Sequence, residues 1–425
     1  LISENSTFID FVFDDIDKDT ILGFYSLHTL RRHLYFLALT APNAEISIFK
    51  KVCIAACSVN YQDVALESMS LLIEKNNDLK ETPDNNQNKL LYCDVNICTN
   101  RLNEAEHLYI DLVSDSNSNM KALFGLSTVY LEKSDFSKFT SCIENIQPIG
   151  ENKSINHLLY FLNNSIEKLQ HTVNSETKDK ISLFIFSHPT ERMKKNHHIA
   201  PPHTTMIEQI ISNISQRISP DSQTVFAYVL YDHRENDIST KYKENIRLLC
   251  ESVRVNLVVN TNNGLRRQWL DGLSRVDDDF ILIVEQDHEI LPLFPKITQL
   301  IDVFRKRPDI NYIKLNRDDN LPEQFDFFAC QSPLDHRTNI TKTSLFSNTP
   351  HIMRRSFFEF FIKPIVEGSH NFDGGNGGAA GIEESINIII KEIAEILGWQ
   401  ITSRLLGMVI RGNLGEKAVT RHLGY

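Results

Sequence analysis

The sequence predicts an all-α domain over residues 1–175, followed by an α/β domain over residues 176–425 with a mostly parallel sheet and helices on both faces. Three observations predict this division. The chain has 425 residues, which is more than one compact domain usually holds. In roughly the first 170 residues, apolar side chains recur three and four positions apart, as in amphipathic helices. From Ile181 onward, short runs rich in Val, Ile and Phe alternate with amphipathic stretches, which is typical of alternating strands and helices.

The all-α part contains three weakly similar stretches, which begin at Lys51, Lys89 and Lys121. Each has an apolar helix, a short polar turn and a second, amphipathic helix. Their spacing is close to the period of about 34 residues found in tetratricopeptide hairpins. Ala65 and Ala105 occupy the small-residue position of that repeat. The pattern therefore favours tetratricopeptide-like hairpins, and an irregular helical domain is the alternative.

The α/β part begins after the polar segment 171–180, which breaks the helical pattern. Its expected strands are nearly continuous apolar runs, which indicates a sheet that is buried on both faces. Ligands of such sheets bind at the carboxyl ends of the strands, so functional residues are sought there. The expected strands lie at 181–187, 224–232, 253–260, 278–287 and 310–316, and the helices at 203–217, 240–252, 264–275 and 295–307.

The composition excludes several classes of protein. A formal net charge of −11 leaves no broad basic face, so no nucleic-acid partner is expected. No run of about 18 apolar residues occurs, so any membrane contact is expected to be peripheral at most. The seven cysteines match no zinc or disulfide spacing, and no signal peptide is apparent. A reduced, cytoplasmic protein is therefore expected, either in solution or at the inner face of the membrane.

The strongest chemical signal is the segment FILIVEQDHEILP, residues 280–292, in which five apolar residues run into Glu285 and Asp287. Residues two apart on a strand point to the same side, so both carboxylates can face one space at the strand's exit. Two carboxylates this close repel each other unless a proton or a cation joins them. A polar turn is the alternative, but the third acid, Glu289, exceeds what a turn needs. A hard divalent cation with oxygen ligands is therefore predicted here.

This Glu-x-Asp segment resembles the metal-binding Asp-x-Asp motif of glycosyltransferases with the GT-A fold, and the resemblance extends over residues 181–425. It implies a nucleotide-sugar donor, with a UDP-sugar favoured, whose diphosphate is held by Mn²⁺ or Mg²⁺. Carried over to this sequence, Asp287 is the direct metal ligand. Glu285, which replaces the first Asp of the motif, is a second ligand or contacts the ribose or a metal-bound water. In the family the metal stabilises the departing diphosphate as a Lewis acid.

Two further features of that family follow in the expected order. The glycine-rich stretch 373–381, which includes Gly377 and Gly378, resembles the loop whose backbone approaches the donor. His422 resembles a C-terminal histidine that completes the metal or diphosphate site, and a neutral imidazole is a suitable ligand beside two carboxylates.

Between these features, Glu383 and Glu384 resemble the acidic pair that supplies the catalytic base in inverting members of the family. Adjacent residues of a helix diverge by about 100°, so only one of the two is expected to face the site. Glu384 is favoured because it matches the second acid of the family's pair. The alternative for both residues is interaction with the positive end of the helix dipole.

The nucleotide end of the donor is expected at the first two strands. By the same resemblance, Ser187, His188 and Arg192 follow the first strand, where the family surrounds the base and ribose. Asp232 ends the second strand, where relatives often form a hydrogen bond to the base.

Arginines and a histidine supply the remaining candidates. Arg266 and Arg267 begin a helix near the exit of the third strand, where a guanidinium can reach a phosphate or a base. A solvated helix face is the alternative for one of them. His351, Arg354 and Arg355 lie in a segment that resembles the acceptor side of the family.

The expected function is transfer of a sugar, with inversion, from a nucleotide-sugar to a hydroxyl of a glycan, a lipopolysaccharide or capsule chain, or a protein, with Glu384 taking the proton of that hydroxyl. The helical domain is expected to bind a protein partner, recognise a large acceptor or form a homo-oligomer. The alternative is a helical-repeat interaction protein that carries a degenerate, non-catalytic transferase domain. A nucleotidyl- or phosphotransferase is disfavoured because the loop SHPTER after the first strand has neither Gly nor Lys.

Overall fold

The computed structural model describes most of the chain from residue 86 onward, together with Cys53, Leu66 and Met69. The described ranges are 86–115, 120–147, 152–171, 179–189, 201–219, 223–261, 264–321, 330–335, 339–343, 345–368, 380–413 and 415–423. Within them, no helix combines the length and the hydropathy of a membrane-spanning segment.

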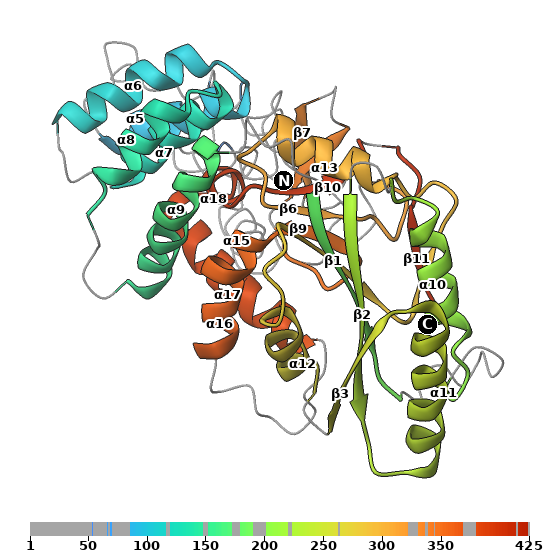
Figure 1. Cartoon of the computed structure of the whole chain (residues 1–425). Helices are drawn as coiled ribbons and strands as arrows, with labels where there is room; N and C mark the ends of the chain where they lie inside the picture. The colour runs from blue at the N-terminus through green and yellow to red at the C-terminus, as the bar shows by residue number, and fades with distance from the viewer. Residues whose placement is uncertain are drawn as a thin grey trace, which may run out of the picture.

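The N-terminal part of the described chain is helical, as expected (Figure 1). The stretches that begin at Lys89 and Lys121 form two helical hairpins, and each helix contacts the next along the chain. The stretch that begins at Lys51 lies outside the described residues, apart from three helical positions, so the repeat itself stays a prediction. The helices are α5 (Asn86–Cys98), α6 (Leu102–Asp115), α7 (Met120–Glu132), α8 (Phe136–Glu144) and α9 (Lys153–His171).

Among the described residues of the C-terminal part, nine strands form one sheet in the order β3-β2-β1-β4-β9-β6-β10-β8-β7. Four neighbouring strands, β3, β2, β1 and β4, are parallel, and β6 is parallel to β10. β9 lies antiparallel between β4 and β6. The strands are β1 (Asp179–Ser187), β2 (Gln223–His233), β3 (Asn256–Thr261), β4 (Phe280–Glu285), β6 (Tyr312–Lys314), β7 (Cys330–Asp335), β8 (Ile340–Thr343), β9 (His351–Arg354) and β10 (Met408–Arg411).

Helices cover both faces of this sheet, which confirms the predicted α/β class (Figure 1). We call them the α11 face and the α17 face. The α11 face carries α10 (Thr205–Ser215), α11 (Asp237–Val253) and α13 (Ile297–Lys306). The α17 face carries α12 (Gly264–Leu273), α15 (Arg355–Phe357), η4 (Phe358–Ile362), α16 (Lys363–Gly368), α17 (Ala380–Leu397) and α18 (Trp399–Leu406).

Successive strand residues alternate between the cores on these two faces, as a pleated strand requires. On β4, Ile281 and Ile283 pack into the core of the α17 face, whereas Leu282 and Val284 pack into the core of the α11 face. Every position must therefore be apolar, which explains the uninterrupted run FILIV. The same alternation decides the direction of each polar residue at the strand's end.

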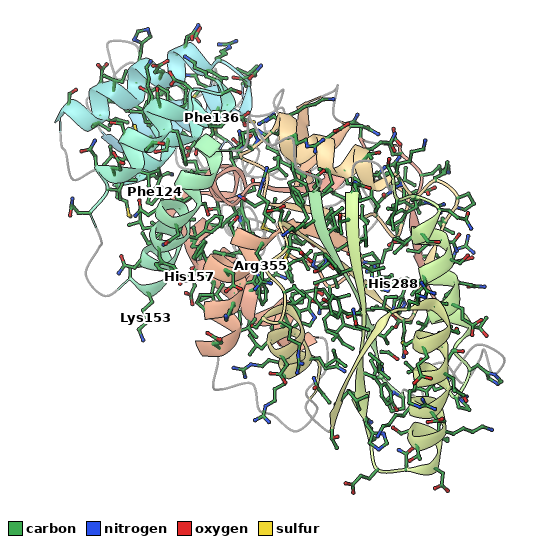
Figure 2. The ribbon with its side chains drawn as sticks, in the orientation of Figure 1. Phe124, Phe136, Lys153, His157, His288 and Arg355 are labelled. Carbon is green, nitrogen blue, oxygen red and sulfur yellow. The ribbon has the colours of Figure 1, made fainter. Side chains whose placement is uncertain are left out.

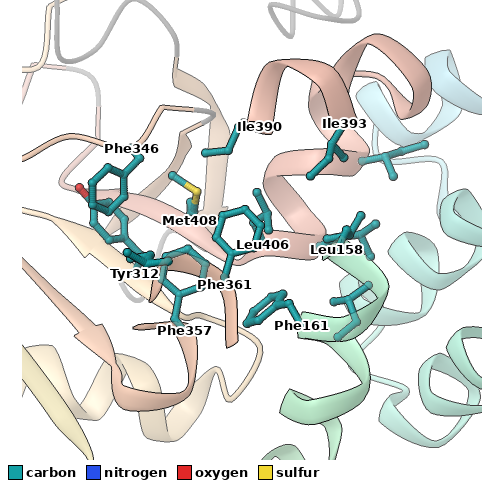
Figure 3. Close-up of a cluster of buried hydrophobic side chains, with 14 of the residues drawn as sticks. Leu158, Phe161, Tyr312, Phe346, Phe357, Phe361, Ile390, Ile393, Leu406 and Met408 are labelled. Carbon is teal, nitrogen blue, oxygen red and sulfur yellow. The ribbon is translucent and has the colours of Figure 1, made fainter. Parts of the chain in front are cut away.

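The N-terminal helices and the α17 face share one hydrophobic core. Leu158 and Phe161 of α9 lie against aromatic and aliphatic side chains of η4, α17 and α18 (Figure 3). The ring of Phe161 lies 5.5 Å from the rings of Phe357 and Phe361, and His157 forms a 2.8 Å hydrogen bond with the carbonyl of Phe361. The change of sequence pattern near residue 175 therefore does not separate two hydrophobic cores.

A buried network of charges also joins the two parts. Arg404 of α18 lies 2.5 Å from Asp309 and 3.2 Å from Glu132 of α7, and its side chain is only 1% exposed. Lys342 pairs with Glu132 at 2.6 Å, and Arg307 pairs with Asp309 at 2.9 Å. Burial alone raises the pKa of Asp309, but Arg404 and Arg307 outweigh it and lower that pKa to about 2.

Replacing Arg404 with Met should lower the free energy of unfolding by about 3–5 kcal/mol, because Glu132 and Asp309 then keep a buried charge without their central partner. Chemical denaturation followed by circular dichroism measures this change. Arg247 is the matched control, since its pairs with Glu244 and Glu251 are exposed on α11. Arg247→Met should cost far less than Arg404→Met, because exposed ion pairs contribute little to stability. Equal effects of the two variants would contradict a joining role for Arg404.

Candidate active site

Four strands end together at one edge of the sheet. β1, β2, β3 and β4 are parallel, and their register places Phe186 opposite Glu285 and Asp232 opposite Asn260. Beyond β4, the chain turns into β5 (His288–Ile290), which pairs with β11 (Thr420–His422) in a separate two-stranded sheet. The carboxyl ends of the parallel strands and the C-terminal segment therefore meet, as the sequence predicted for the candidate site.

Alternation along β4 sends its terminal polar residues to opposite faces. Glu285 follows Ile281 and Ile283 toward the α17 face, whereas Gln286 follows Leu282 and Val284 toward the α11 face. The carboxylate of Glu285 thus faces helix α17, and the amide of Gln286 faces helix α11.

Gln286 fixes the turn after β4. Its side-chain oxygen accepts hydrogen bonds from Ser187 at 2.7 Å and from Tyr242 of α11 at 2.8 Å, and its side-chain nitrogen donates to the carbonyl of His188 at 2.6 Å. Ser187 and Gln286 are buried. Ser187 therefore holds the strand ends in place from the α11 face, and His188 contributes its backbone. Sequence analysis did not assign a role to Tyr242 or Gln286, although Gln286 lies between the two acids of the predicted metal site.

Two imidazoles hold the carboxylate of Asp287. The Nδ1 atom of His288 lies 3.2 Å from one carboxylate oxygen, and the Nε2 atom of His422 lies 3.1 Å from the other. The β5–β11 register pairs His288 with His422, and the amide of Leu423 donates to the carbonyl of Asp287 at 2.8 Å. Burial favours the protonated acid, but hydrogen bonds from both histidines outweigh it, so the pKa of Asp287 falls below its usual value. Burial lowers the pKa of His288, which favours its neutral, ligating form.

The residues around Asp287 suit a divalent cation. Ligand atoms of Glu285, Asp287 and His288 lie within 4.8 Å of one another. Two atoms that share an octahedral ion with bonds of 2.0–2.1 Å lie about 3 Å apart, close to the spacing between Asp287 and His422. Burial and the charges of Asp287 and Glu383 raise the pKa of Glu285 well above its usual value. A cation there would relieve this repulsion, and carboxylate ligands suit Mg²⁺ or Mn²⁺.

Glu383 and Glu384 point in different directions from the first turn of α17. Glu383 is half-buried and close enough to Glu285 to raise its pKa, whereas Glu384 is exposed. The amide of Asn348 donates to the Glu383 carboxylate at 3.2 Å. One turn later, the side chain of Asn387 both donates to and accepts from the backbone of Phe346, each at 3.0 Å. These bonds orient Glu383 toward the side of Glu285, whereas Glu384, which the sequence favoured, is exposed.

The donor-binding candidates occupy different environments. Asp232 lies on the α17 face and accepts a 3.3 Å hydrogen bond from the amide of Gly264. Arg266 donates to the carbonyl of Val366 at 2.8 Å and thereby joins α12 to α16. Arg267 is exposed on α12. Arg192, Gly377 and Gly378 lie outside the described residues.

The three acceptor-side candidates have interior partners. His351 is fully buried among Trp269, Tyr312 and Phe346, and shares a 2.8 Å hydrogen bond with the carbonyl of Thr349. Arg354 donates to the carbonyls of Ile310 and Phe304 at 2.7 and 2.6 Å. Arg355 donates to the carbonyl of Leu273 and pairs with Glu359. Their contacts stabilise the sheet and its helices.

No protein-family model matches the chain, and no curated protein matches its sequence. Some solved structures are distantly similar. GalNAc-T7 with UDP, GalNAc and Mn²⁺ is 13% identical over 57% of this chain and 45% of its own length, with a TM-score of 0.36. Glucosyl-3-phosphoglycerate synthase from Mycobacterium tuberculosis with Mn²⁺ and UDP is 14% identical over 60% of this chain and 75% of its own, with a TM-score of 0.33. UDP-glucose pyrophosphorylase with UDP-glucose is 10% identical over 58% of this chain and 94% of its own length, with a TM-score of 0.33.

This chain therefore spans less than half the length of GalNAc-T7. At these scores the similarity is remote, and the activity has to follow from the site residues.

The burial of His351 predicts a pH dependence of stability. Burial and, to a lesser extent, Lys314 lower the pKa of His351 from 6.5 to about 4. Between these values the unfolded chain binds a proton that the folded chain does not bind. Stability should therefore fall as the pH falls from 6.5 to 4, by about 3 kcal/mol from this group.

The variant His351→Asn keeps a side-chain N–H donor for Thr349 but does not titrate. Its unfolding free energy, measured by denaturation between pH 4 and 7, should depend less on pH than that of the wild type. His203 is exposed, so His203→Asn is the control and should leave the slope unchanged. A slope in His351→Asn as steep as in the wild type would refute the assignment.

Proposed function

We propose that this protein is a metal-dependent glycosyltransferase that moves a sugar from a nucleotide-sugar, favoured to be a UDP-sugar, to a hydroxyl group of a glycan, lipopolysaccharide, capsule or protein acceptor. One observation carries the proposal. A candidate set of metal ligands, Glu285, Asp287, His288 and His422, lies at the carboxyl edge of a parallel sheet, opposite a fixed carboxylate, Glu383. A glycosyl transfer needs both parts, an electrophile that stabilises the leaving diphosphate and a base for the acceptor.

Asp287 is the central ligand in this proposal, because its two oxygens are already oriented by His288 and His422. Glu285 supplies a second carboxylate from the end of β4. Bound Mn²⁺ or Mg²⁺ would act as a Lewis acid toward the diphosphate. Gln286, Ser187 and Tyr242 keep the turn rigid from the opposite face, so that the ligands need little rearrangement.

Glu383 is the proposed general base. The backbone amide of Asn348 donates to its carboxylate and orients it. Glu383 would accept the proton of the acceptor hydroxyl as that oxygen attacks the anomeric carbon from the side opposite the leaving diphosphate, which inverts the configuration. Asp232, on the same face of the sheet, is proposed to bind the nucleobase of the donor. The remaining donor-side candidates are Arg267, Arg192, Gly377 and Gly378.

A thermal-shift screen of UDP, GDP, CDP, ADP and their sugar conjugates, with and without Mn²⁺, tests the donor site. A ligand at about 100 times its dissociation constant should add about 2.7 kcal/mol of stability. We expect a shift that requires both Mn²⁺ and one nucleotide, and its loss in Asp287→Asn. Glu289→Gln is the control, since Glu289 lies two residues beyond Asp287, on β5, but pairs with Arg421. If no nucleotide shifts the folded wild type, the interaction-protein alternative is favoured.

The base assignment is tested with the nucleotide-sugar from that screen and water as acceptor. Glu383→Gln should lower the rate of donor hydrolysis by about 100-fold or more, because general-base catalysis is worth about that much. Its affinity for the nucleotide with Mn²⁺ should be retained. Glu384→Gln is the matched control and should change the rate by less than about threefold, since its side chain is exposed. The reverse pattern would assign the base to Glu384.

A further inference from the structure

The chain that leads into β9, residues 346–350, lies beside the end of β4. β9 is antiparallel to β4, and its first residue, His351, pairs with Ile283. The residues that precede His351 therefore continue toward the carboxyl end of β4, whose last residue is Glu285. All five residues of this segment are buried. We call residues 346–350 the pre-β9 segment.

The backbone of the pre-β9 segment holds two side chains of α17. The amide of Asn348 donates to the carboxylate of Glu383 at 3.2 Å. One helical turn later, the side chain of Asn387 forms two hydrogen bonds with the backbone of Phe346. The direction of the Glu383 carboxylate therefore depends on how firmly the segment itself is held.

The hydroxyl group of Tyr312, on β6, fixes the segment to the sheet. It donates a 2.9 Å hydrogen bond to the carbonyl of Ser347 and accepts a 3.3 Å hydrogen bond from the amide of the same residue. Both residues are buried, so removal of the hydroxyl deprives two buried backbone groups of this partner. His351 shares a 2.8 Å hydrogen bond with the carbonyl of Thr349. Asn348 thus lies between two residues whose backbone is held by side chains of the sheet.

We infer that Tyr312 is a positioning residue for Glu383. Its hydroxyl holds Ser347, and Ser347 in turn keeps the amide of the next residue directed at the Glu383 carboxylate. The inference rests on the proposed function, because it concerns the same general base. Tyr312 is fully buried in the core of the α17 face, so it acts through Glu383 and not on the substrate. Sequence analysis did not select Tyr312, since a Tyr in an apolar strand has the pattern of a core residue.

The variant Tyr312→Phe tests the inference, because it removes the hydroxyl and keeps the ring. The assay is hydrolysis of the nucleotide-sugar from the donor screen, with water as acceptor. We expect kcat to fall about tenfold or more, since a displaced general base is inefficient. KM, and the affinity for the nucleotide with Mn²⁺, should change by less than about twofold, because the metal ligands are unaltered.

Tyr231→Phe is the matched control. Tyr231 is also fully buried in the sheet, and its hydroxyl also donates to a backbone carbonyl, that of Ser239, at 2.9 Å. It lies in the core of the α11 face, opposite Tyr312. Both variants should lose similar stability in chemical denaturation, but only Tyr312→Phe should lose activity. Equal losses of kcat in the two variants would overturn the inference.

A double variant separates positioning of the base from general damage to the fold. Glu383→Gln already lacks the group that Tyr312 positions, so adding Tyr312→Phe should lower its rate by less than about twofold. If the second substitution costs as much in this background as in the wild type, Tyr312 does not act through Glu383.

Hydrogen exchange of the Asn348 amide provides a readout that needs no substrate. This amide should exchange about fivefold faster or more in Tyr312→Phe, and at the wild-type rate in Tyr231→Phe. If exchange accelerates but the wild type hydrolyses no donor, the link from Tyr312 to Glu383 stands and the proposed function fails. If hydrolysis depends on Glu383 but Tyr312→Phe is as active as the wild type, the function stands and the positioning role fails.

Discussion

Burial of both faces of the central sheet is the constraint on which the rest of the structure depends. Each strand residue belongs either to the core with α11 or to the core with α17, and this alternation continues past the last apolar residue of β4. It therefore decides to which face of the sheet each polar residue at the end of β4 points. Glu285 faces α17, which carries Glu383. Gln286 faces α11, where Tyr242 and Ser187 donate hydrogen bonds to its side-chain oxygen. The face toward α17 carries Glu285, near Glu383, and the face toward α11 holds the turn that follows β4.

The N-terminal helices act on the site through α17. Glu383 lies in the first turn of this helix, and Glu392, farther along it, accepts a hydrogen bond from Ser154 of α9. Helix α9 also packs Phe161 and aliphatic side chains such as Leu158 into the same core (Figure 3). Figure 2 shows His288 well apart from Phe124 of α7 and Phe136 of α8. The described contribution of the N-terminal helices is to hold the helix that carries the proposed base.

The two neighbouring carboxylates at the end of β4 have pKa values that are shifted in opposite directions. Asp287 is kept ionised by two imidazoles, whereas Glu285 is driven toward protonation by burial and by its acidic neighbours. Neighbouring carboxylates with pKa values shifted in opposite directions are typical of functional sites, because a fold gains no stability from such repulsion. The interior network around Arg404 is different, since each buried acid there lies beside a cation and its pKa is lowered. That network stabilises the fold, whereas the opposite pKa shifts of Asp287 and Glu285 support the proposal of a ligand site there.

The sequence alone determined the local features of this protein. The apolar runs predicted the strands of a doubly covered sheet, and the adjacency of Glu285 and Asp287 at a strand's end predicted the candidate metal site, because period-two geometry acts between near neighbours. Only the tertiary structure decided the rest. Local pattern could not choose between Glu383 and Glu384, since the choice depends on how α17 packs against the sheet. It could not show that His288 and His422 hold one carboxylate, that Ser187 faces away from Glu285, or that Asn316 accepts a hydrogen bond from Thr420 of β11. Each of these depends on contacts between segments that are distant in the chain, which sequence spacing does not record.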